Sequence, residues 1–241
     1  DLYIRNYNDT IFNEIINSEL SDSLSYVYSD LPYFLLKFYL EKKYQLSLDT
    51  QIKNYLYDKI GSTSLTYKPT NFLDKKLIVP TAVDDYFRFN LVEGHVHDMG
   101  AAMMDGISGH AGLFGNSLDI AKILQLFLQK GSYANEKFFD EKFFDLFNFR
   151  HFKEKKVRRG IGFDKSELDP NDPNTCGCAS DKSFGHYGFT GSVAWADPET
   201  EIIYVFLSNR TFPDENNNSL SEFNIRTEIQ KLVHEAFDWM N

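Results

Sequence analysis

The sequence predicts an α+β fold, in which a helical region is followed by three antiparallel strands and a C-terminal helix. From Asp1 to about Lys130, apolar residues recur mostly at helical spacing. After Arg158 the pattern changes to short apolar runs separated by polar turns, and the C-terminal segment returns to helical spacing. Helices and antiparallel strands that occupy separate parts of a chain are typical of the α+β class.

Two helices are expected in the first part of the chain. Asp30 can cap the first helix, with Pro32 in its first turn. Its apolar stripe consists of Leu31, Phe34, Leu35 and Phe38. The second helix begins at Asp49, ends at Gly61 and carries Ile52, Tyr55, Leu56 and Ile60. Residues 62–115 are rich in Pro, Gly and Asp, which predicts a long irregular segment that is either functional or packed on a scaffold.

A third helix follows this segment. Asn116 or Ser117 caps it, and Gly131 ends it. Its apolar face consists of Ile120, Ile123, Leu124 and Phe127. The phenylalanine-rich segment 136–145 repeats a five-residue unit only once, which favours a core-facing helix over a repeat architecture.

Three strands and a last helix are expected after Arg158. The strands are Gly160–Phe163, Phe184–Ala196 and Ile202–Leu207, and a hairpin turn at Asp197-Pro198-Glu199-Thr200 joins the second to the third. The third strand is apolar throughout, as a strand covered on both faces would be. The last helix spans about Ser221–Trp239 and buries Ile225, Ile229, Leu232, Val233 and Ala236.

Length and charge restrict the class of protein. A chain of 241 residues can bury a real core, as one large domain or two small ones. The net charge of −10 argues against a nucleic-acid groove and against adhesion to an anionic membrane. No apolar run is long enough for a membrane span, and no signal peptide opens the chain.

The segment from Phe184 to Gly191 carries three glycines, a histidine and a threonine in an expected strand. Glycine weakens a strand interior, so its repeated use suggests that another group approaches the backbone closely. Histidine adds a side chain that can change charge near neutral pH. An edge strand with a bulge is the structural alternative.

The metal-binding possibilities are weak, and neither a metal nor a cofactor is expected. A disulfide between Cys176 and Cys178 would be strained, and two thiolates cannot close a zinc site, so these cysteines are expected in a turn. His95, His97 and Asp98 invite a metal-dependent hydrolase hypothesis. The spacing does not fit the metallo-hydrolase pattern, which favours loop-anchoring side chains instead.

Two further segments could be functional or structural. The loop from Gly109 to Phe114 contains small residues that permit close packing, and a structural role is favoured there. Tyr28-Ser29-Asp30 precedes the first helix. Tyr28 is either a packed aromatic residue or a general base whose pKa is lowered by positive charge nearby.

Together these segments resemble the serine β-lactamase superfamily, in its class C and penicillin-binding esterase branch. Tyr28-Ser29-Asp30 resembles the Tyr-x-Asn box of that family, with Asp30 in place of Asn. His186-Tyr187-Gly188 resembles its Lys/His-Thr/Ser-Gly box, with Tyr187 in place of the small hydroxyl residue. Gly106–Phe114, Ile202–Arg210 and the final helix resemble further parts of the domain, so the resemblance covers nearly the whole chain.

The resemblance implies acyl transfer through a serine ester. Tyr28 and a lysine would transfer protons to and from the serine. His186 would supply positive charge or a hydrogen bond, and the Phe189 N–H would belong to the oxyanion hole. Asp30, Tyr187 and Gly188 would contact the substrate. The implied substrate is a small molecule or a peptidoglycan-derived amide or ester, and the implied location is exported, periplasmic or in the cell envelope.

The nucleophile that the resemblance implies is a Ser followed three residues later by Lys, and no such pair occurs in these 241 residues. We therefore expect a partial domain over 1–241, helical and irregular over 1–150 and strand-rich over 151–241. A first helix, two strands and the nucleophile helix would precede Asp1. The free edge of the strand Ile202–Leu207 would be covered by that upstream segment or by another chain.

Three alternatives remain open from the sequence. The chain could be a non-catalytic binding or scaffolding module without a nucleophile. It could be the C-terminal domain of a fusion with a family 3 glycoside hydrolase of the β-N-acetylglucosaminidase type. The metal-dependent hydrolase using His95, His97 and Asp98 is the third alternative.

Overall fold

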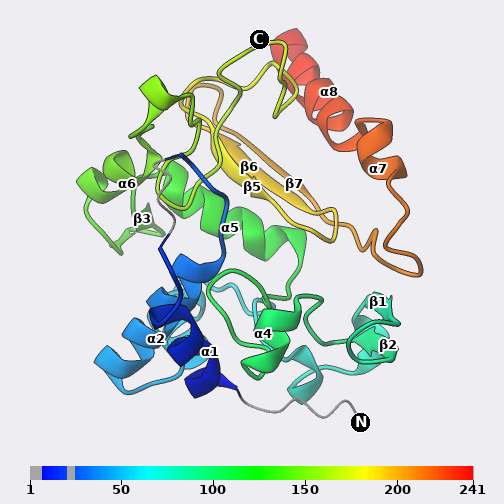
Figure 1. Cartoon of the computed structure of the whole chain (residues 1–241). Coiled ribbons are helices and arrows are strands. Elements are labelled where there is room, and N and C mark those ends of the chain that lie inside the picture. Colours follow the sequence, from blue (N-terminus) through cyan, green and yellow to red (C-terminus); the bar gives the residue numbers. More distant parts are fainter. Residues whose placement is uncertain (1–6, 21–24, 241) are drawn as a thin grey trace. The chain divides into compact units, whose positions relative to one another are not determined.

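The computed structural model describes residues 7–20 and 25–240, and for residues 238–240 it describes only the backbone (Figure 1). The chain forms two compact units, one up to Gly115 and the other from Asn116 onward. The sequence predicted a boundary at residue 150, between a helical part and a strand-rich part. The boundary between the two compact units differs, because it follows Gly115. The helices between residues 117 and 148 belong to the same unit as the strands that follow residue 150.

The first unit is mainly helical. Its helices are α1 (Asn8–Ile16), α2 (Leu31–Tyr44), α3 (Leu48–Ile52), the π-helical turn η1 (Lys53–Tyr57), the 3₁₀ turns η2 (Pro69–Asn71) and η3 (Lys75–Leu77), and α4 (Met99–Met103). Its strands β1 (Pro80–Asp84) and β2 (Asn90–Glu93) form an antiparallel hairpin. The predicted irregular segment 62–115 thus contains a hairpin and a short helix, which its Pro and Gly content concealed.

The helix expected after Asp30 is confirmed as α2, but its apolar stripe is only partly buried. Phe34 is buried, whereas Leu31 and Leu35 are exposed in the described structure. Lys37 is buried instead, with its ammonium 3.0 Å from the Glu41 carboxylate one turn later. The second helix begins at Leu48, and Gly61 ends the segment with a φ of +67°.

The second unit contains α5 (Ser117–Leu128), the small hairpin β3 (Ser132–Tyr133) and β4 (Glu136–Lys137), α6 (Glu141–Asn148) and the 3₁₀ turn η4 (Lys153–Lys155). A three-stranded antiparallel sheet follows in the order β5 (Phe184–Tyr187), β6 (Val193–Asp197) and β7 (Ile202–Phe206). The chain ends with α7 (Ser219–Glu222) and α8 (Ile225–Met240).

The sheet lies between α5 and α8 (Figure 1) and separates two apolar clusters. Toward α5 lie Leu124, Phe144, Phe184 and Ala196, with Phe127 and Phe163 packed against them. Toward α8 lie Val193, Trp195 and Tyr204, with Ile229 packed against them. The alternation of side chains along each strand sends His186 and Tyr187 to opposite faces. The last strand, β7, packs on both apolar clusters, so the cover expected on both of its faces is confirmed.

Four expectations about the second unit differ from the structure. Gly160–Phe163 forms no strand, and only Asp164 bridges to the sheet, through paired backbone hydrogen bonds with Gly185. Phe184–Ala196 is a hairpin, because the chain turns at 188–192. In the segment 136–145, the first residues form β4, and the helix starts only after Asp140, whose carboxylate accepts from Lys142 N. The last helix is interrupted near Asn224, where φ is +52°.

Gly185 shows why glycine is needed in this hairpin. A Cβ atom there would lie 2.3 Å from the Ala194 carbonyl oxygen and 2.5 Å from the Trp195 ring. The glycine-rich sequence suggested that another group approaches the backbone closely. At Gly185 that group is the neighbouring strand with its buried Trp195.

Cys176 and Cys178 are joined by a disulfide, which corrects the expectation of an unbonded turn. Gly177 between them has a φ of +72°, a conformation that glycine adopts at little cost. The resulting bend brings the two Cα atoms to 5.2 Å, within the usual span of a disulfide.

Among the described residues, no helix combines the length and apolar character that crossing a bilayer requires.

Candidate functional site

His186 on β5 is the histidine of the Lys/His-Thr/Ser-Gly box, and both of its ring nitrogens have partners. Nδ1 lies 2.7 Å from the Tyr187 carbonyl oxygen, and Nε2 lies 2.9 Å from Arg159 Nη1. A carbonyl oxygen can only accept, and a guanidinium can only donate. In this arrangement Nδ1 donates to the carbonyl oxygen and Nε2 accepts from the guanidinium. The positive charge beside the box comes from Arg159.

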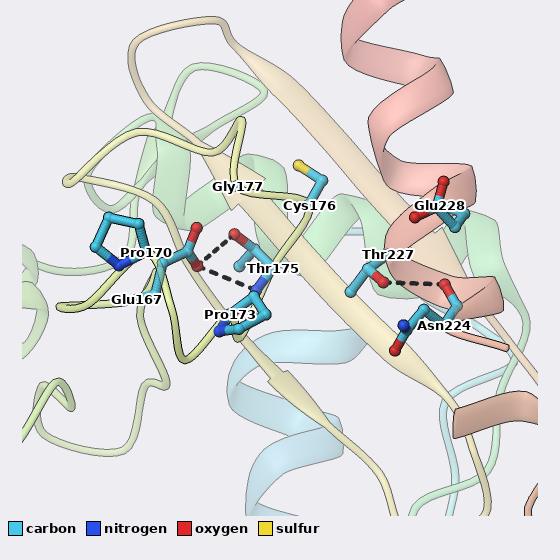
Figure 2. A pocket seen from close by; sticks show the side chains of 9 residues that line it. All are labelled: Glu167, Pro170, Pro173, Thr175, Cys176, Gly177, Asn224, Thr227 and Glu228. Carbon is cyan, nitrogen blue, oxygen red and sulfur yellow. Dashed lines mark hydrogen bonds between the residues drawn. The ribbon is translucent and has the colours of Figure 1, made fainter. Parts of the chain in front are cut away.

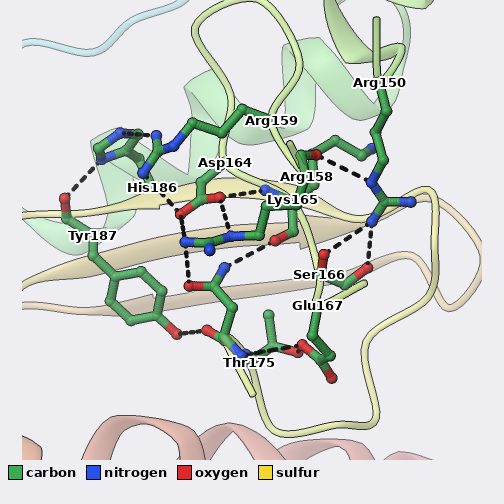
Figure 3. Close-up of polar contacts among 11 residues, drawn as sticks. Arg150, Arg158, Arg159, Asp164, Lys165, Ser166, Glu167, Thr175, His186 and Tyr187 are labelled. Atoms are coloured by element: carbon green, nitrogen blue, oxygen red, sulfur yellow. Dashed lines mark hydrogen bonds and ion pairs between the residues drawn. The ribbon is translucent and has the colours of Figure 1, made fainter. Parts of the chain in front are cut away.

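Asp164 organises the cations around His186 (Figure 3). Its buried carboxylate accepts from Arg158 Nε at 2.8 Å and from Arg159 Nη2 at 3.1 Å. Asp164 is fixed beside β5 by its backbone bridge to Gly185. One carboxylate between two guanidinium groups leaves a local excess of positive charge. Charge-assisted hydrogen bonds of this kind hold their groups in defined directions.

Tyr187 faces α8 rather than the face that carries His186. Its hydroxyl donates to the Asn174 carbonyl oxygen at 2.7 Å, and the Arg226 guanidinium lies 5.0 Å from its ring centroid. Burial raises the pKa of Tyr187 to about 12. These contacts anchor the loop before the sheet to β5, and the role of Tyr187 in substrate binding stays a prediction.

Gly188 and Phe189 lie in the turn between β5 and β6. Gly188 N donates to Ser192 O at 2.7 Å, which closes the turn. Arg210 stabilises it from outside, because its Nε donates to the Phe189 carbonyl oxygen at 2.9 Å and its guanidinium covers the Phe189 ring. The Phe189 ring is 64% exposed. The turn thus holds the Phe189 peptide in place, as an oxyanion donor requires.

Tyr28 and Asp30 belong to the first unit. The Tyr28 side chain is 58% exposed. The Ser29 hydroxyl accepts from Leu31 N at 3.3 Å, and the Asp30 carbonyl oxygen accepts from Tyr33 N at 2.9 Å. These bonds fix the box at the start of α2. Its contact with His186 stays a prediction, because the two boxes belong to different units.

His110 links the loop after α4 to the end of the Tyr28 box. Its Nε2 lies 2.9 Å from Asp98 Oδ1, and its Nδ1 lies 2.9 Å from the Ser108 hydroxyl. Burial raises the pKa of Asp98, but the hydrogen bonds from His110 and Ala101 N outweigh it and bring the pKa below its ordinary value. Ser108 is buried, so this Ser-His-Asp chain of contacts fixes a loop and offers no accessible hydroxyl nucleophile.

The ligand set of the metal-dependent hydrolase hypothesis is not assembled. Within the described residues, the side chains whose ligand atoms gather around Asp98 are Asp30 and His110. His95 and His97 are not part of that group, so the described residues do not bring together the three side chains of that alternative.

Lys165 is a titratable residue that sequence reasoning missed. It is 2% exposed, and its ammonium donates to Asn148 Oδ1 at 2.6 Å and to the Lys182 carbonyl oxygen at 3.2 Å. Burial, and then the positive charge of Arg150, lower its pKa to about 7. No sequence pattern indicates this burial, since lysine in a polar loop is usually exposed.

We expect Lys165 to make the fold more stable as pH rises above 7. Between its folded pKa of about 7 and its ordinary value of 10.5, the unfolded chain binds a proton that the folded chain does not. Unfolding free energy should therefore increase with pH, by at most about 1.4 kcal/mol per pH unit. Urea unfolding at pH 7, 8 and 9 measures this. Lys165→Met should remove the slope, and the exposed control Lys182→Met should keep it. Equal slopes in all three proteins would contradict the assignment.

The fold and the order of its boxes define a domain of the β-lactamase and transpeptidase type. Similar folds occur in a β-lactamase from Mycobacterium bovis, with a TM-score of 0.59, 15% identity and coverage of 88% of this chain and 65% of that one. A penicillin-binding protein homologue from Caulobacter crescentus gives a TM-score of 0.58 and 15% identity, with coverage of 84% and 58%. At this identity the likeness concerns the fold alone.

The chain belongs to the β-lactamase family, whose sequence profile matches residues 22–226. An N-acetylmuramyl-L-alanine amidase from Bacillus subtilis is 32% identical over 210 residues, which are 80% of this chain and 47% of that protein. A putative D-alanyl-D-alanine carboxypeptidase from Salmonella agona is 30% identical over 209 residues, with the same coverage. The chain thus spans about half the length of these curated relatives.

Proposed function

We propose that this chain is part of a serine hydrolase that forms an acyl-enzyme on an amide or ester of the bacterial cell wall. The observation that carries the proposal is the His186-Tyr187-Gly188-Phe189 hairpin, fixed by Arg159 and Arg210, within a chain of the β-lactamase family. The names of the amidase and carboxypeptidase relatives support a cell-wall substrate. Such a substrate also supports an exported, periplasmic or cell-envelope location.

The mechanism begins with attack of a serine hydroxyl on the substrate carbonyl. A lysine and Tyr28 take the hydroxyl proton and return it to the leaving group. The Phe189 N–H, together with the N–H of the serine, stabilises the negative oxygen that forms. Water then hydrolyses the ester. The substrate lies against Gly188 and the backbone of Tyr187, and Asp30 contributes to binding.

Arg159 supplies the positive charge that the family pattern assigns to the Lys/His position. Because His186 accepts a hydrogen bond from Arg159, it is held in one tautomer and one orientation. A cation close to Tyr28 would favour its ionised form and thus its work as a base. In this proposal Arg159 is a positioning residue, because its guanidinium orients His186.

The serine and lysine are supplied by sequence outside this chain. No Ser-x-x-Lys occurs in the 241 residues, and the chain spans 47% of its amidase relative. The missing pair also supports the second candidate, a non-catalytic binding module. A fusion with a β-N-acetylglucosaminidase is a further proposal about the sequence outside this chain.

Covalent labelling distinguishes the two candidates. The full-length gene product should form a stoichiometric adduct with a serine-directed fluorophosphonate, seen as a mass increase of the intact protein. A full-length product that stays unlabelled while it binds muropeptides would favour the non-catalytic module.

A further inference from the structure

One face of α8 presents two buried polar side chains to the loop that carries the cysteines. Gln230 and His234 lie one turn apart, and they are 1% and 5% exposed. Gln230 Oε1 accepts from Cys176 N at 3.2 Å, which holds the loop against the helix. His234 makes no hydrogen bond within the part of the chain that the structure describes.

The partners within reach of His234 are the two sulfur atoms. Cys176 Sγ, Cys178 Sγ and a ring nitrogen of His234 all lie within 4.8 Å of one another. Thiolate and neutral imidazole are the preferred ligands of zinc, with Zn–S distances of about 2.3 Å and Zn–N distances of about 2.0 Å. Tetrahedral geometry at those distances separates two thiolates by roughly 3.8 Å. Once reduced, the two sulfurs need only small movements to reach one ion.

The surroundings suit a cation and give it a route of entry. A pocket of about 390 Å³ adjoins Cys176, between the loop and the start of α8, and Glu167 and Glu228 line it (Figure 2). The carboxylates favour a positive ion in the pocket. Cys178 is exposed to solvent, so reductants and metal ions can reach the sulfurs.

We propose that Cys176, Cys178 and His234 form a redox-gated zinc site. A thiol or phosphine reductant supplies two electrons, solvent exchange supplies two protons, and the S–S bond becomes two thiols. Zn²⁺ then displaces the two thiol protons and binds two thiolates and the neutral imidazole, with water in the fourth position. The disulfide and the metal-bound dithiolate are alternative states of the same sulfurs. The zinc site uses none of the residues assigned to hydrolysis, so it can be tested independently of the proposed function.

Cobalt titration tests the site, because Co²⁺ substitutes for zinc and reports thiolate ligation by near-ultraviolet charge-transfer absorption. The full-length protein, reduced with a phosphine under anaerobic conditions, should bind one equivalent of Co²⁺ that Zn²⁺ displaces. The oxidised protein should bind none at these sulfurs. Absence of the charge-transfer band in the reduced protein, or an identical response of the oxidised protein, would overturn the proposal.

Two variants test the ligand set. Cys178→Ser and His234→Gln should each lower the Co²⁺ affinity by about 100-fold or more, because losing a ligand exceeds the 10–100-fold typical of an outer-shell partner. His151→Gln, a histidine outside the cluster, is the matched control and should bind as the native protein does. Retained affinity in His234→Gln would refute the role of that imidazole.

Alkylation of the native protein covers the case in which His234→Gln does not fold. Zn²⁺ should slow the reaction of the reduced cysteines with iodoacetamide at least tenfold. Equal alkylation rates with and without Zn²⁺ would count against the site.

Discussion

Replacing Tyr28 by Phe in the full-length enzyme is expected to lower kcat by about two to four orders of magnitude, the usual contribution of a positioned acid or base. The substitution removes only the phenolic oxygen. Tyr28 is 58% exposed, so neither packing nor stability should suffer. Substrate affinity should change far less than kcat, because the hydroxyl acts on the proton and not on substrate binding. Steady-state kinetics on a cell-wall peptide measure both.

Tyr26 provides the matched control, since it is a tyrosine of similar exposure two residues earlier. Tyr26→Phe should leave kcat unchanged. If Tyr28→Phe retains full kcat, Tyr28 has no role in proton transfer and the match to the Tyr-x-Asn box is without functional meaning.

Phe189→Pro should lower kcat by about 10²- to 10³-fold, because proline removes the backbone N–H assigned to the oxyanion hole. Phe189→Ala keeps that N–H and loses only an exposed ring that packs on Arg210, so its kcat should stay near the native value. Thermal unfolding of both variants checks that the turn survives. Equal losses of kcat in the proline and alanine variants would assign the effect to the side chain and remove Phe189 from the oxyanion hole.

The parts of the fold that local patterns determine could be predicted from the sequence. Asn116 caps α5 by accepting from Asp119 N at 2.9 Å. Of the expected apolar face Leu124 is buried, and Leu126, outside that face, is buried as well. The last strand is one continuous apolar run with cover on both faces, as its sequence indicates. The first two strands were misplaced because the turn at 188–192 interrupts an otherwise strand-like sequence, and because Gly160–Phe163 has strand composition but no partner.

The charged contacts around the candidate site could not be predicted from the sequence. His186 was expected to supply positive charge or a hydrogen bond, and the cation that contacts it is Arg159, which lies 27 residues earlier and reaches His186 only through the fold. Asp164 binds both Arg158 and Arg159, although nothing in the local sequence connects it with β5. Contacts of this kind depend on tertiary structure, and a single sequence does not encode them in any period or motif.

The same limit applies to the cysteines. Read along the chain, Cys176 and Cys178 are two thiols without a third ligand. The structure adds His234 from α8, which is far away in the sequence and near in space. Lys165 is a parallel case, because its burial arises from Asn148 and the Lys182 carbonyl oxygen enclosing its ammonium group.

The central claim is that a serine outside residues 1–241 is acylated in a site to which this chain contributes the oxyanion and proton-transfer groups. Peptide mapping by mass spectrometry of the fluorophosphonate-labelled, full-length gene product tests it most directly. We expect one modified serine, located outside residues 1–241 and followed three residues later by lysine. We also expect that the 241-residue chain alone remains unlabelled. A modified serine within this chain would contradict the claim.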